Sequence, residues 1–454
     1  MSTDSTDLFC PLEFRYGREE VRLLFSRSRR LERALEVEAA LAETQAELGI
    51  IPLEAARGIR EAVSERRVSL ERVDELEVEL RHDVMAIARA LGEAAGPGAG
   101  YVHLGATSAD ITDTALALEH REALAVLRQD LTGLSRVLLE LARTHRATPE
   151  VGRTHGQHAV PMSFGYKMAG AAAEVLRQRE RLDELAPRLA VGKMAGAVGT
   201  GAGFGAQAAE VEVGVMRRLG LTADEAPSQV VGRDRIAEAT NWLALLAGTC
   251  ERLSTEVRNL QRTEIAEVSE PFDERHQVGS STMAQKRNPM ASENVTSLAR
   301  LVRAFALPPL ENMALWHERD LTNSANERIV MPHAILLTDD MLHKLLRVFG
   351  ALRVDAARMA TNLGSSEGSM TENLMLALAA KGVARAEAHE ALRQLTRPGA
   401  AGTTLAERAR SDPYIARHFS PAEVDSLLDP TTYVQAAAAK TDRVLAQLLP
   451  KLDR

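Results

Sequence analysis

The sequence has few of the features that mark specialised classes of protein. Aromatic residues make up only 4% of its 454 residues, and it contains two cysteines, Cys10 and Cys250. Cysteines so far apart form neither a disulfide framework nor a metal-binding motif. No run of apolar residues approaches the ~18–20 that a membrane span needs. The acidic, polar start of the chain lacks the basic and apolar segments of a signal peptide. We therefore expect a soluble, reduced, cytoplasmic protein with no membrane partner.

Charge of one sign is not in excess either. Lysine and arginine together number 55, and aspartate and glutamate number 63, which gives a formal net charge of -8. This balance argues against a nucleic-acid partner, and the ordinary share of hydrophobic residues argues against long disorder. Neither a Gly-x-Gly-x-x-Gly segment nor a P-loop is present, so the sequence predicts no nucleotide cofactor.

What the sequence does contain is helical periodicity. The clearest apolar seam runs from 236 to 260 with alternating spacings of three and four residues, which places its members on one face of a long helix. Further helices are expected at about 130–145 and 167–189, and few segments alternate as strands do. Helices this long bury their apolar faces only in a bundle, either within the chain or completed by other subunits. The seam consists of Ile236, Ala239, Leu243, Leu246, Cys250, Leu253, Val257 and Leu260.

Glycine-rich breaks interrupt the helical pattern at 96–100, 364–369 and 397–402. They predict an all-α chain in three consecutive parts. We expect an N-terminal helical domain over 1–110, a central domain of long bundled helices over 111–355, and a C-terminal helical domain over 356–454.

The most unusual segment runs from Gly279 to Pro289 and has neither a helical stripe nor strand alternation. A Gly-Ser-Ser turn can aim successive backbone N–H groups at an anion, and Lys286 adds a full positive charge. Ser280 could lose its proton more easily there than a free alcohol does, because the alkoxide would be stabilised. The alternative is an ordinary solvent-exposed loop of serine and glycine beside basic residues.

Histidines provide a second signal. His82, His103 and His155 each have hydrogen-bonding neighbours in the sequence that could fix the imidazole tautomer, as acid–base catalysis requires. The alternative for each is a purely structural role. His155 and His158 could share a helix face as metal ligands, but no carboxylate or cysteine cluster accompanies them, so no metal site is predicted.

Several residues are candidates for binding an anion. Thr107 and Ser108 could cap a following helix whose first turn holds Asp110, and a helix N-terminus rich in hydroxyls is also a ready carboxylate site. Arg15-Tyr16, Arg319 and Arg328 are the other candidates. The alternative for each of these arginines is that it is only solvated or ion-paired and binds no ligand.

These pieces resemble, in order, the fumarase/aspartase superfamily. The segment from Gly279 to Pro289 is similar to its signature loop Gly-Ser-Ser-x-Met-Pro-x-Lys-x-Asn-Pro, with Ala284 in place of proline. The resemblance covers essentially the whole chain. It is nearest to the adenylosuccinate lyase branch, although carboxymuconate cycloisomerases share much of the pattern. The other matching segments are 14–17, 81–84, 103–110, 152–161, 261–264 and 316–328.

The resemblance implies a mostly helical, three-domain fold whose central helices join those of three partner subunits in a twenty-helix core. Such a core would explain the apolar seam at 236–260, which the chain alone would struggle to bury. It also implies a homotetramer in which each active site combines loops from three subunits. Isolated monomers should then be inactive even if they fold.

The resemblance further implies a lyase that releases fumarate from a substituted succinate, a small dicarboxylate, with no cofactor. A base removes a proton from the carbon next to one carboxylate, an aci-carboxylate dianion forms, and the β-substituent then leaves. By position in the motifs, Ser280 corresponds to the base and His155 to the acid that protonates an amine leaving group. Lys286 and Asn288 correspond to groups that neutralise the intermediate. The positions that correspond to substrate-binding residues are Arg15, Tyr16, His82, Asp83, His103, Thr107, Ser108, Gln157, Gln229, Ser281, Arg319, Ser324 and Arg328.

The identity of the leaving group depends on finer details. In favour of adenylosuccinate, Arg15-Tyr16, Ser324 and Arg328 match positions that hold the nucleotide phosphate. A non-enzymatic structural protein on the same scaffold is the alternative hypothesis. The presence of Ser280, Lys286, Asn288 and His155 together argues against it.

Other positions differ from the branch pattern. Ala284 replaces proline, Gly232 stands where glutamine is common, and the stretch 364–372 replaces Gly-Leu-Ile-x-Ser-Glu. We therefore predict a specialised member with a smaller leaving group, such as a lyase that expels nitrite from nitrosuccinate. The alternatives are adenylosuccinate lyase and, after it, carboxymuconate cycloisomerase.

Overall fold

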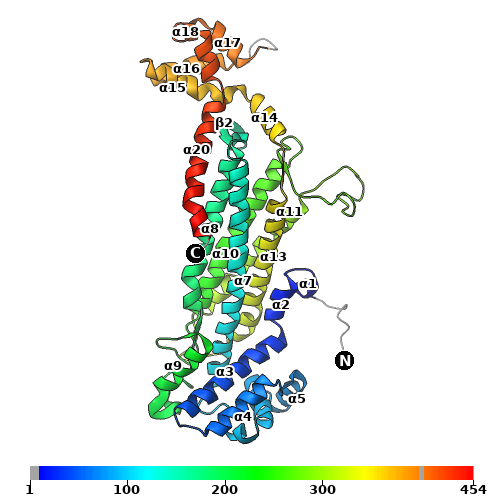
Figure 1. Ribbon diagram of the computed structural model, residues 1–454, viewed down its shortest axis with the longest axis vertical. Coiled ribbons are helices and arrows are strands. Elements are labelled where there is room, and N and C mark those ends of the chain that lie inside the picture. The colour runs from blue at the N-terminus through cyan, green and yellow to red at the C-terminus, as the bar shows by residue number, and fades with distance from the viewer. Residues whose placement is uncertain (1–9, 398–402, 453–454) are drawn as a thin grey trace. The chain divides into compact units, whose positions relative to one another are not determined.

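The computed structural model describes residues 10–397 and 403–452, and most of these residues lie in helices (Figure 1). The all-α prediction is confirmed. The described chain divides into two compact units, each built from several stretches of sequence. Unit 1 contains residues up to 131, with 177–251 and 294–344, and unit 2 contains 132–176, 252–293 and the residues from 345 onward. The division into domains at 110 and 355 stays a prediction.

Short N-terminal helices form one apolar cluster in unit 1. Leu76 on one helix and Ile59 and Leu91 on others are fully buried in it. The expected break at 96–100 is a 3-10 helix, η1 (Gly96–Tyr101). The helices are α1 (Pro11–Phe14), α2 (Glu19–Leu24), α3 (Arg27–Glu47), α4 (Leu53–Ser64), α5 (Leu70–Leu80) and α6 (Asp83–Ala94).

Long helices follow, and three of them correspond to helices predicted from the sequence. The expected helix at 167–189 lies within α8 (Phe164–Leu189), and the helix at 130–145 is only the second half of α7 (Ser108–Thr144). The sequence did not predict the first half of α7, because its buried face carries polar residues that interrupt the apolar stripe. Asp113, Glu119 and His120 are among them. The remaining helices of this region are α9 (Ala208–Leu219), α10 (Asp234–Leu260), α11 (Met290–Ala304), α12 (Leu307–Glu311) and α13 (Ser324–Gly350).

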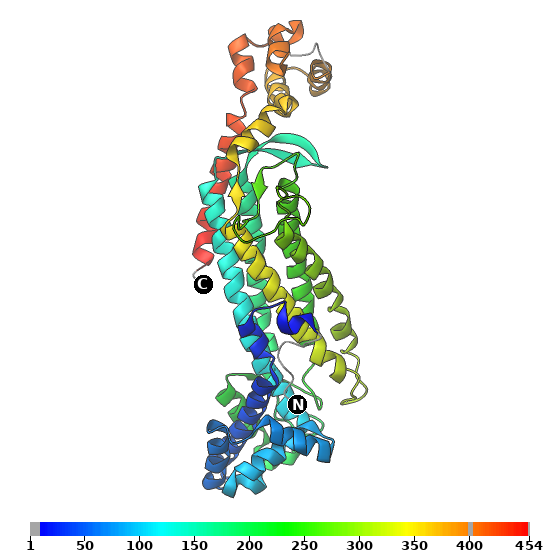
Figure 2. The same ribbon diagram turned by 90° about the vertical axis from the view of Figure 1, so that its right-hand side faces the viewer.

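The apolar seam predicted for 236–260 forms one face of α10, and all eight of its residues are buried within the chain. The expectation that the chain alone struggles to bury this seam is therefore wrong. Helix α8 lies beside α10 in both views (Figures 1 and 2). In unit 1, Trp242 Nε1 donates a hydrogen bond to the Gln178 carbonyl at 3.1 Å. The ion pair between Lys167 and Glu256 joins the same two helices in unit 2.

Three small two-stranded sheets were not predicted. β1 (Pro149–Thr154) and β2 (Gln157–Ser163) form an antiparallel hairpin, which Figure 2 shows as a pair of arrows. β3 (Val191–Gly192) pairs in parallel with β4 (Thr222–Ala223), and β5 (Val268–Ser269) pairs antiparallel with β6 (Arg353–Val354). The two-residue strands are too short to show alternation, and in the hairpin the burial of β1 does not alternate.

The C-terminal helices in unit 2 have a small apolar core of their own, with Leu378, Ala388 and Ile415 among its buried residues. The expected break at 364–369 falls at the end of α14. The break expected at 397–402 lies, apart from residue 397, outside the described residues. The elements are α14 (Ala356–Gly364), η3 (Glu367–Met370), α15 (Thr371–Ala380), α16 (Arg385–Leu395), α17 (Leu405–Ser411), α18 (Pro413–Ala416), α19 (Pro421–Leu427), α20 (Thr431–Leu448) and η4 (Leu449–Lys451). Across the parts of the chain that the structure describes, no helix is both long enough and apolar enough to cross a bilayer.

Helix α5 offers a matched test of the N-terminal core. Leu76 is fully buried, whereas Val78 on the same helix is 81% exposed. We expect Leu76→Ala to lower the free energy of unfolding by about 2–5 kcal/mol, because it removes buried methyl groups and leaves a cavity. Val78→Ala should change it by no more than about 0.5 kcal/mol. Urea titrations followed by circular dichroism would measure both, and equal effects would contradict the burial described above.

Candidate active site

His155 lies at the tip of the β1–β2 hairpin. The strands pair up to Thr154 and Gln157, which leaves His155 and Gly156 as a two-residue loop. Both loop residues have positive φ, 54° and 74°, which is what the tightest hairpin turns require and explains the glycine. His155 and Gln157 are exposed. His155 and His158 therefore do not share a helix face, and the idea of a helical ligand pair is wrong.

The hairpin is held by polar contacts close to its tip, most of them partly buried. The Arg153 guanidinium donates to both oxygens of the buried Glu267 carboxylate, at 2.9 and 2.7 Å. Asn362 Nδ2 donates to the same carboxylate at 2.8 Å. On the other strand, His158 Nδ1 forms a hydrogen bond with Ser366 Oγ. The Ser366 Oγ also lies 3.0 Å from the Asn362 carbonyl oxygen.

The signature loop lies between β5 and α11. The Ser280 Oγ accepts hydrogen bonds from the backbone N–H groups of Thr282 and Met283, at 3.2 and 3.1 Å. Donors of this kind favour the ionised form of the oxygen that accepts them. Ser281 and Lys286 are exposed in the same loop. The loop geometry is therefore suited to lowering the cost of forming an alkoxide at position 280.

The ends of this loop are clasped together. Asn288 Nδ2 donates to the Gly279 carbonyl at 3.0 Å, so its amide closes the loop on itself. Gln261 Nε2 donates to the Arg287 carbonyl at 3.1 Å. The Glu270 carboxylate accepts from the first N–H groups of α11, at 3.1 and 2.7 Å, where the helix dipole favours a negative charge.

Thr107 and Ser108 stand at the start of α7, as expected. The buried Asp110 carboxylate accepts the Thr107 N–H at 2.8 Å. It also accepts the N–H groups of Ala195 and Gly196 and forms an ion pair with Lys193, which is itself fully buried. This carboxylate joins the hydroxyl-bearing turn to the segment after β3.

His103 has a carboxylate partner that the sequence did not identify. Glu38 Oε1 lies 2.6 Å from His103 Nδ1, and Glu38 Oε2 accepts the His103 N–H at 3.1 Å. Burial lowers the pKa of His103, but the hydrogen bond and charge of Glu38, helped by Asp110, outweigh it, so this pKa is raised. The imidazole therefore keeps its proton to a higher pH than a free histidine.

Other predicted binding residues of unit 1 fall into contacting pairs. Arg328 Nη2 lies 3.1 Å from the Asp83 carboxylate, next to His82, which caps α6. Arg319 Nη1 donates to Gln229 Oε1 at 3.0 Å.

The remaining candidates of unit 1 lie at the ends of helices. Ser324 is the first residue of α13. Arg15 follows α1, and the Tyr16 ring beside it lies 5.3 Å from Lys344 Nζ.

The candidates are distributed over both units. Unit 2 holds the predicted catalytic set together with Gln157 and Ser281, and unit 1 holds the other predicted binding residues. Between the described side chains of His155 and Ser280 there is no hydrogen bond. Among residues 10–397 and 403–452, no cluster of three or more His, Cys, Asp or Glu side chains is placed to hold a metal ion.

Sequence reasoning missed the charged residues that support these turns, namely Glu38, Lys193, Arg153 and Glu267. A signal was available for one of them. Lys193 stands alone among apolar residues, and a charge in such a stretch is buried only when it is paired.

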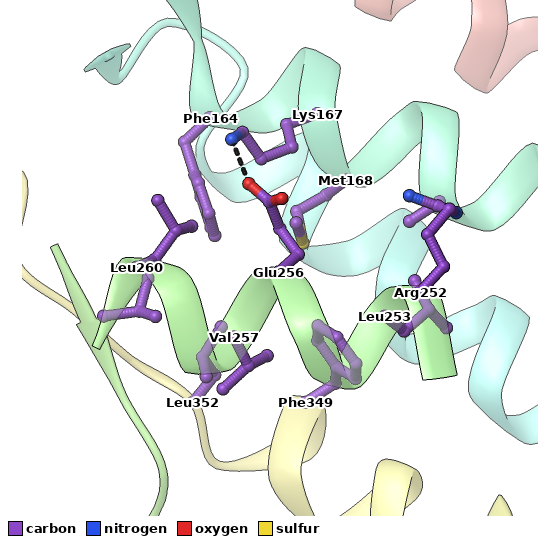
Figure 3. Close-up of a pocket in the computed structure, with 12 residues that line it drawn as sticks. Phe164, Lys167, Met168, Arg252, Leu253, Glu256, Val257, Leu260, Phe349 and Leu352 are labelled. Carbon is purple, nitrogen blue, oxygen red and sulfur yellow. Dashed lines mark hydrogen bonds and ion pairs between the residues drawn. The ribbon is translucent and has the colours of Figure 1, made fainter. Parts of the chain in front are cut away.

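A cavity of about 130 Å³ in unit 2 contains none of the predicted site residues. Lys167 and Glu256 form an ion pair at its edge (Figure 3), and Lys167 also lies 2.9 Å from the Glu150 carboxylate. Burial raises the pKa of Glu150 to about 7. The other side chains shown in the figure are mostly apolar, among them Phe164, Met168, Leu253, Val257, Leu260, Phe349 and Leu352.

Comparison with known proteins gives the family. A sequence model described as "Lyase" matches residues 13–304, and another described as "Adenylosuccinate lyase C-terminus" matches residues 369–444. Proteins named adenylosuccinate lyase from Pyrococcus abyssi and Methanothermobacter thermautotrophicus are 46% and 43% identical to this chain. Each match covers 96% of this chain, with 97% and 98% of the relatives' own lengths. The chain belongs to the fumarase/aspartase superfamily. It is therefore an enzyme, a lyase that forms fumarate by β-elimination across a C–N bond.

Solved structures agree with this superfamily fold. The fumarate lyase from Mesorhizobium sp. BNC1 and the 3-carboxy-cis,cis-muconate lactonizing enzyme from Pseudomonas putida each match with a TM-score of 0.86. Their sequence identities are 33% and 32%, and the matches cover 95% and 97% of this chain and 98% of each of theirs.

The His103–Glu38 pair predicts a pH-dependent contribution to stability. A histidine whose pKa is raised by folding stabilises the folded state below its unfolded pKa of about 6.5, and this stabilisation is lost as the pH rises through the raised value. We expect Glu38→Gln to lower the unfolding temperature most at acidic pH, and the difference from the wild type should shrink as the pH rises through the raised pKa of His103. Glu36→Gln, which removes a partly exposed partner of Arg60, is the control. Thermal scans between pH 5 and 8 would measure the effect, and a difference that does not vary with pH would contradict it.

Proposed function

We propose that this lyase cleaves adenylosuccinate to fumarate and adenosine monophosphate. The observation that carries the proposal is identity of 43–46% over 96% of the chain to relatives that bear the name adenylosuccinate lyase. A match of residues 369–444 to the C-terminal part of adenylosuccinate lyases supports it as well. The preference for a nitrosuccinate-type lyase is supported less well than this alternative.

In the proposed reaction, Ser280 removes the proton from the carbon next to one carboxylate of the succinyl group. The electron pair passes into the aci-carboxylate and then forms the carbon–carbon double bond, while the bond to nitrogen breaks. His155 delivers the proton that the departing amine needs. The N–H groups that point at Ser280 Oγ and the ammonium of Lys286 in the same loop support these roles, since both favour negative charge nearby.

The adenylate end is proposed to meet the residues matched to the phosphate-binding positions. Arg15 has an exposed side chain that makes no hydrogen bond with any described residue. Tyr16, Ser324 and Arg328 complete the set. The hydroxyl-bearing start of α7 is proposed to take a carboxylate of the succinyl group, because helix N-termini favour anions.

A homotetramer with shared active sites remains part of the proposal, as does the cytoplasm as its location. Large apolar side chains stay exposed in unit 1 at Leu301, Leu307, Leu310 and Met313, and exposed apolar clusters of this kind are typical of association surfaces. The proposed reaction requires no cofactor.

The decisive experiment is a direct assay of the wild type. Adenylosuccinate cleavage can be followed by the change in ultraviolet absorbance, with nitrosuccinate, argininosuccinate, aspartate and carboxymuconate in parallel. We expect turnover of adenylosuccinate. Nitrite release from nitrosuccinate without adenylosuccinate cleavage would favour a specialised nitrosuccinate lyase. Absence of turnover with every substrate would favour a structural protein.

Two loop variants test the chemistry. Ser280→Ala and Lys286→Ala should each lower kcat by about 10²–10³-fold, the effect of removing one essential charge-stabilising or proton-transfer group, while the protein folds normally. Thr282→Ala is the matched control, because it alters an exposed side chain of the same loop and keeps the N–H that points at Ser280. Near-normal turnover in either test variant would rule out the proposed mechanism.

His155→Ala tests the acid. An amine is a poor leaving group without a proton, so we expect the variant to lose about 10²–10⁴-fold in kcat on adenylosuccinate. Any cleavage of nitrosuccinate by the wild type should be affected far less, because nitrite leaves readily as an anion. Comparable losses on both substrates would show that His155 is not the proton donor to the amine.

A further inference from the structure

The segment that carries Arg15 and Tyr16 is fastened to α13 through its backbone. The N–H groups of Gly17 and Arg18 donate to Asp340 Oδ1 at 3.2 Å and to Asp339 Oδ2 at 2.9 Å. Gly17 has a φ of +75°, and a Cβ there would lie 2.9 Å from Leu336 Cδ2. Only glycine lets the chain turn this close to the helix.

The Arg18 guanidinium fastens the same segment through its side chain. Its Nε donates to Asp339 Oδ1 at 2.8 Å, and its Nη2 donates to Asp130 Oδ2 on α7 at 2.5 Å. The Asp339 side chain is fully buried and that of Asp130 nearly so. One arginine thus links α7 and α13 to the segment that begins with Arg15.

The charges around Arg18 make this link specific to a guanidinium. Burial raises the pKa of Asp130 to about 7, the charges of Asp339 and Glu20 act in the same direction, and Arg18 opposes them. Without Arg18 the two aspartates would face each other with no cation between them. A planar guanidinium reaches both carboxylates at once, which the single ammonium of a lysine does less well.

The three arginines between residues 15 and 22 make different contacts. Arg22 Nη1 donates to the carbonyls of Tyr16 and Gly17, at 3.2 and 2.7 Å, and Arg18 is engaged as described. The Arg15 side chain, by contrast, is exposed and makes no hydrogen bond with the residues that the structure describes. Its backbone N–H donates to the Pro11 carbonyl at 2.7 Å. The stretch therefore has a rigid base and one cation left for a ligand.

We propose that Arg18, held between Asp339 and Asp130, is a positioning residue that sets Arg15 and Tyr16 for the phosphate monoester of the substrate's leaving group. The inference rests on the proposed function. It assigns Arg18 to recognition of the phosphate and not to the chemistry at the succinyl end.

Arg18→Lys in the full-length protein separates this role from a general structural one. Kinetics would be compared on adenylosuccinate and on succinyladenosine, which lacks the phosphate. We expect KM for adenylosuccinate to rise about tenfold with kcat changed by less than about twofold, the pattern of lost ground-state binding. The kcat/KM for succinyladenosine should change by less than about twofold. Equal losses on both substrates, or a wild-type KM for adenylosuccinate, would overturn the proposal.

A binding measurement separates failure of this inference from failure of the proposed function. Calorimetry with AMP needs no turnover, and both Arg18→Lys and Arg15→Ala should weaken AMP binding by about tenfold. This result would support the positioning role even if the wild type did not cleave adenylosuccinate. AMP binding that is unchanged in Arg18→Lys, or absent in the wild type, would overturn it.

Two further variants complete the test. Arg27→Lys alters an arginine in an exposed ion pair with Asp74 and should leave every constant unchanged. Asp130→Asn keeps an oxygen acceptor for Arg18 but removes a charge. It should also raise KM for adenylosuccinate, but by less than Arg18→Lys does. This variant decides the question if Arg18→Lys does not fold. An unchanged KM in a folded Asp130→Asn, together with an unfolded Arg18→Lys, would overturn the proposal.

Discussion

A charged side chain buried among helices must have a partner, and this requirement fixes the turns that carry the candidate site. Asp110 is satisfied by Lys193 and by the N–H of Thr107. Glu267 is satisfied by Arg153, two residues before His155 on the same strand. Asp339 is satisfied by Arg18, just after Arg15 and Tyr16. In each case the buried group is a carboxylate, and the turn that carries the site residues supplies the hydrogen-bond donor or lies next to it. The turn is therefore restricted to the position in which the buried carboxylate keeps its partner.

Such pairs are better explained by placement than by stability. Removing a carboxylate and a cation from water costs roughly as much as their attraction returns, and apolar replacements of buried pairs are often neutral or stabilising. What an apolar contact lacks is direction. The Arg153 guanidinium meets Glu267 through two parallel hydrogen bonds, which fixes the orientation of β1 as well as its distance. The strained residue at the tip, His155 with a φ of 54°, lies two residues after this anchored arginine.

The sequence predicted the parts of the molecule whose pattern repeats or whose composition is unusual. The seam of α10 was recognised because eight apolar residues recur at helical spacing, and the loop around Ser280 was recognised because no repeat explains its hydroxyls and cations. The first half of α7 and the hairpin were missed. On α7, buried polar residues such as Asp113 and His120 break the stripe, and their pairing becomes visible only when distant segments are brought together. For the hairpin, the informative signal was the pair His155-Gly156 between two short strands, which is weak without the register. The seam also misled, since its residues are buried without help from another subunit.

The prediction of a smaller leaving group rested on single positions that differ from the branch pattern, and the structure shows what those positions do. The Ala284 carbonyl accepts from Arg287 within the loop at 2.7 Å, and the Gly232 N–H donates to Asp224 at 3.3 Å. Ser366 holds His158 close to the tip of the hairpin. All three contacts shape backbone or orient a neighbour, and two of them are made by backbone atoms. Differences of this kind reflect how a loop is built and carry little information about the leaving group. Similarity along the whole chain includes many positions besides these few. The relatives at 43–46% identity therefore weigh more heavily in the assignment than the altered loop residues do.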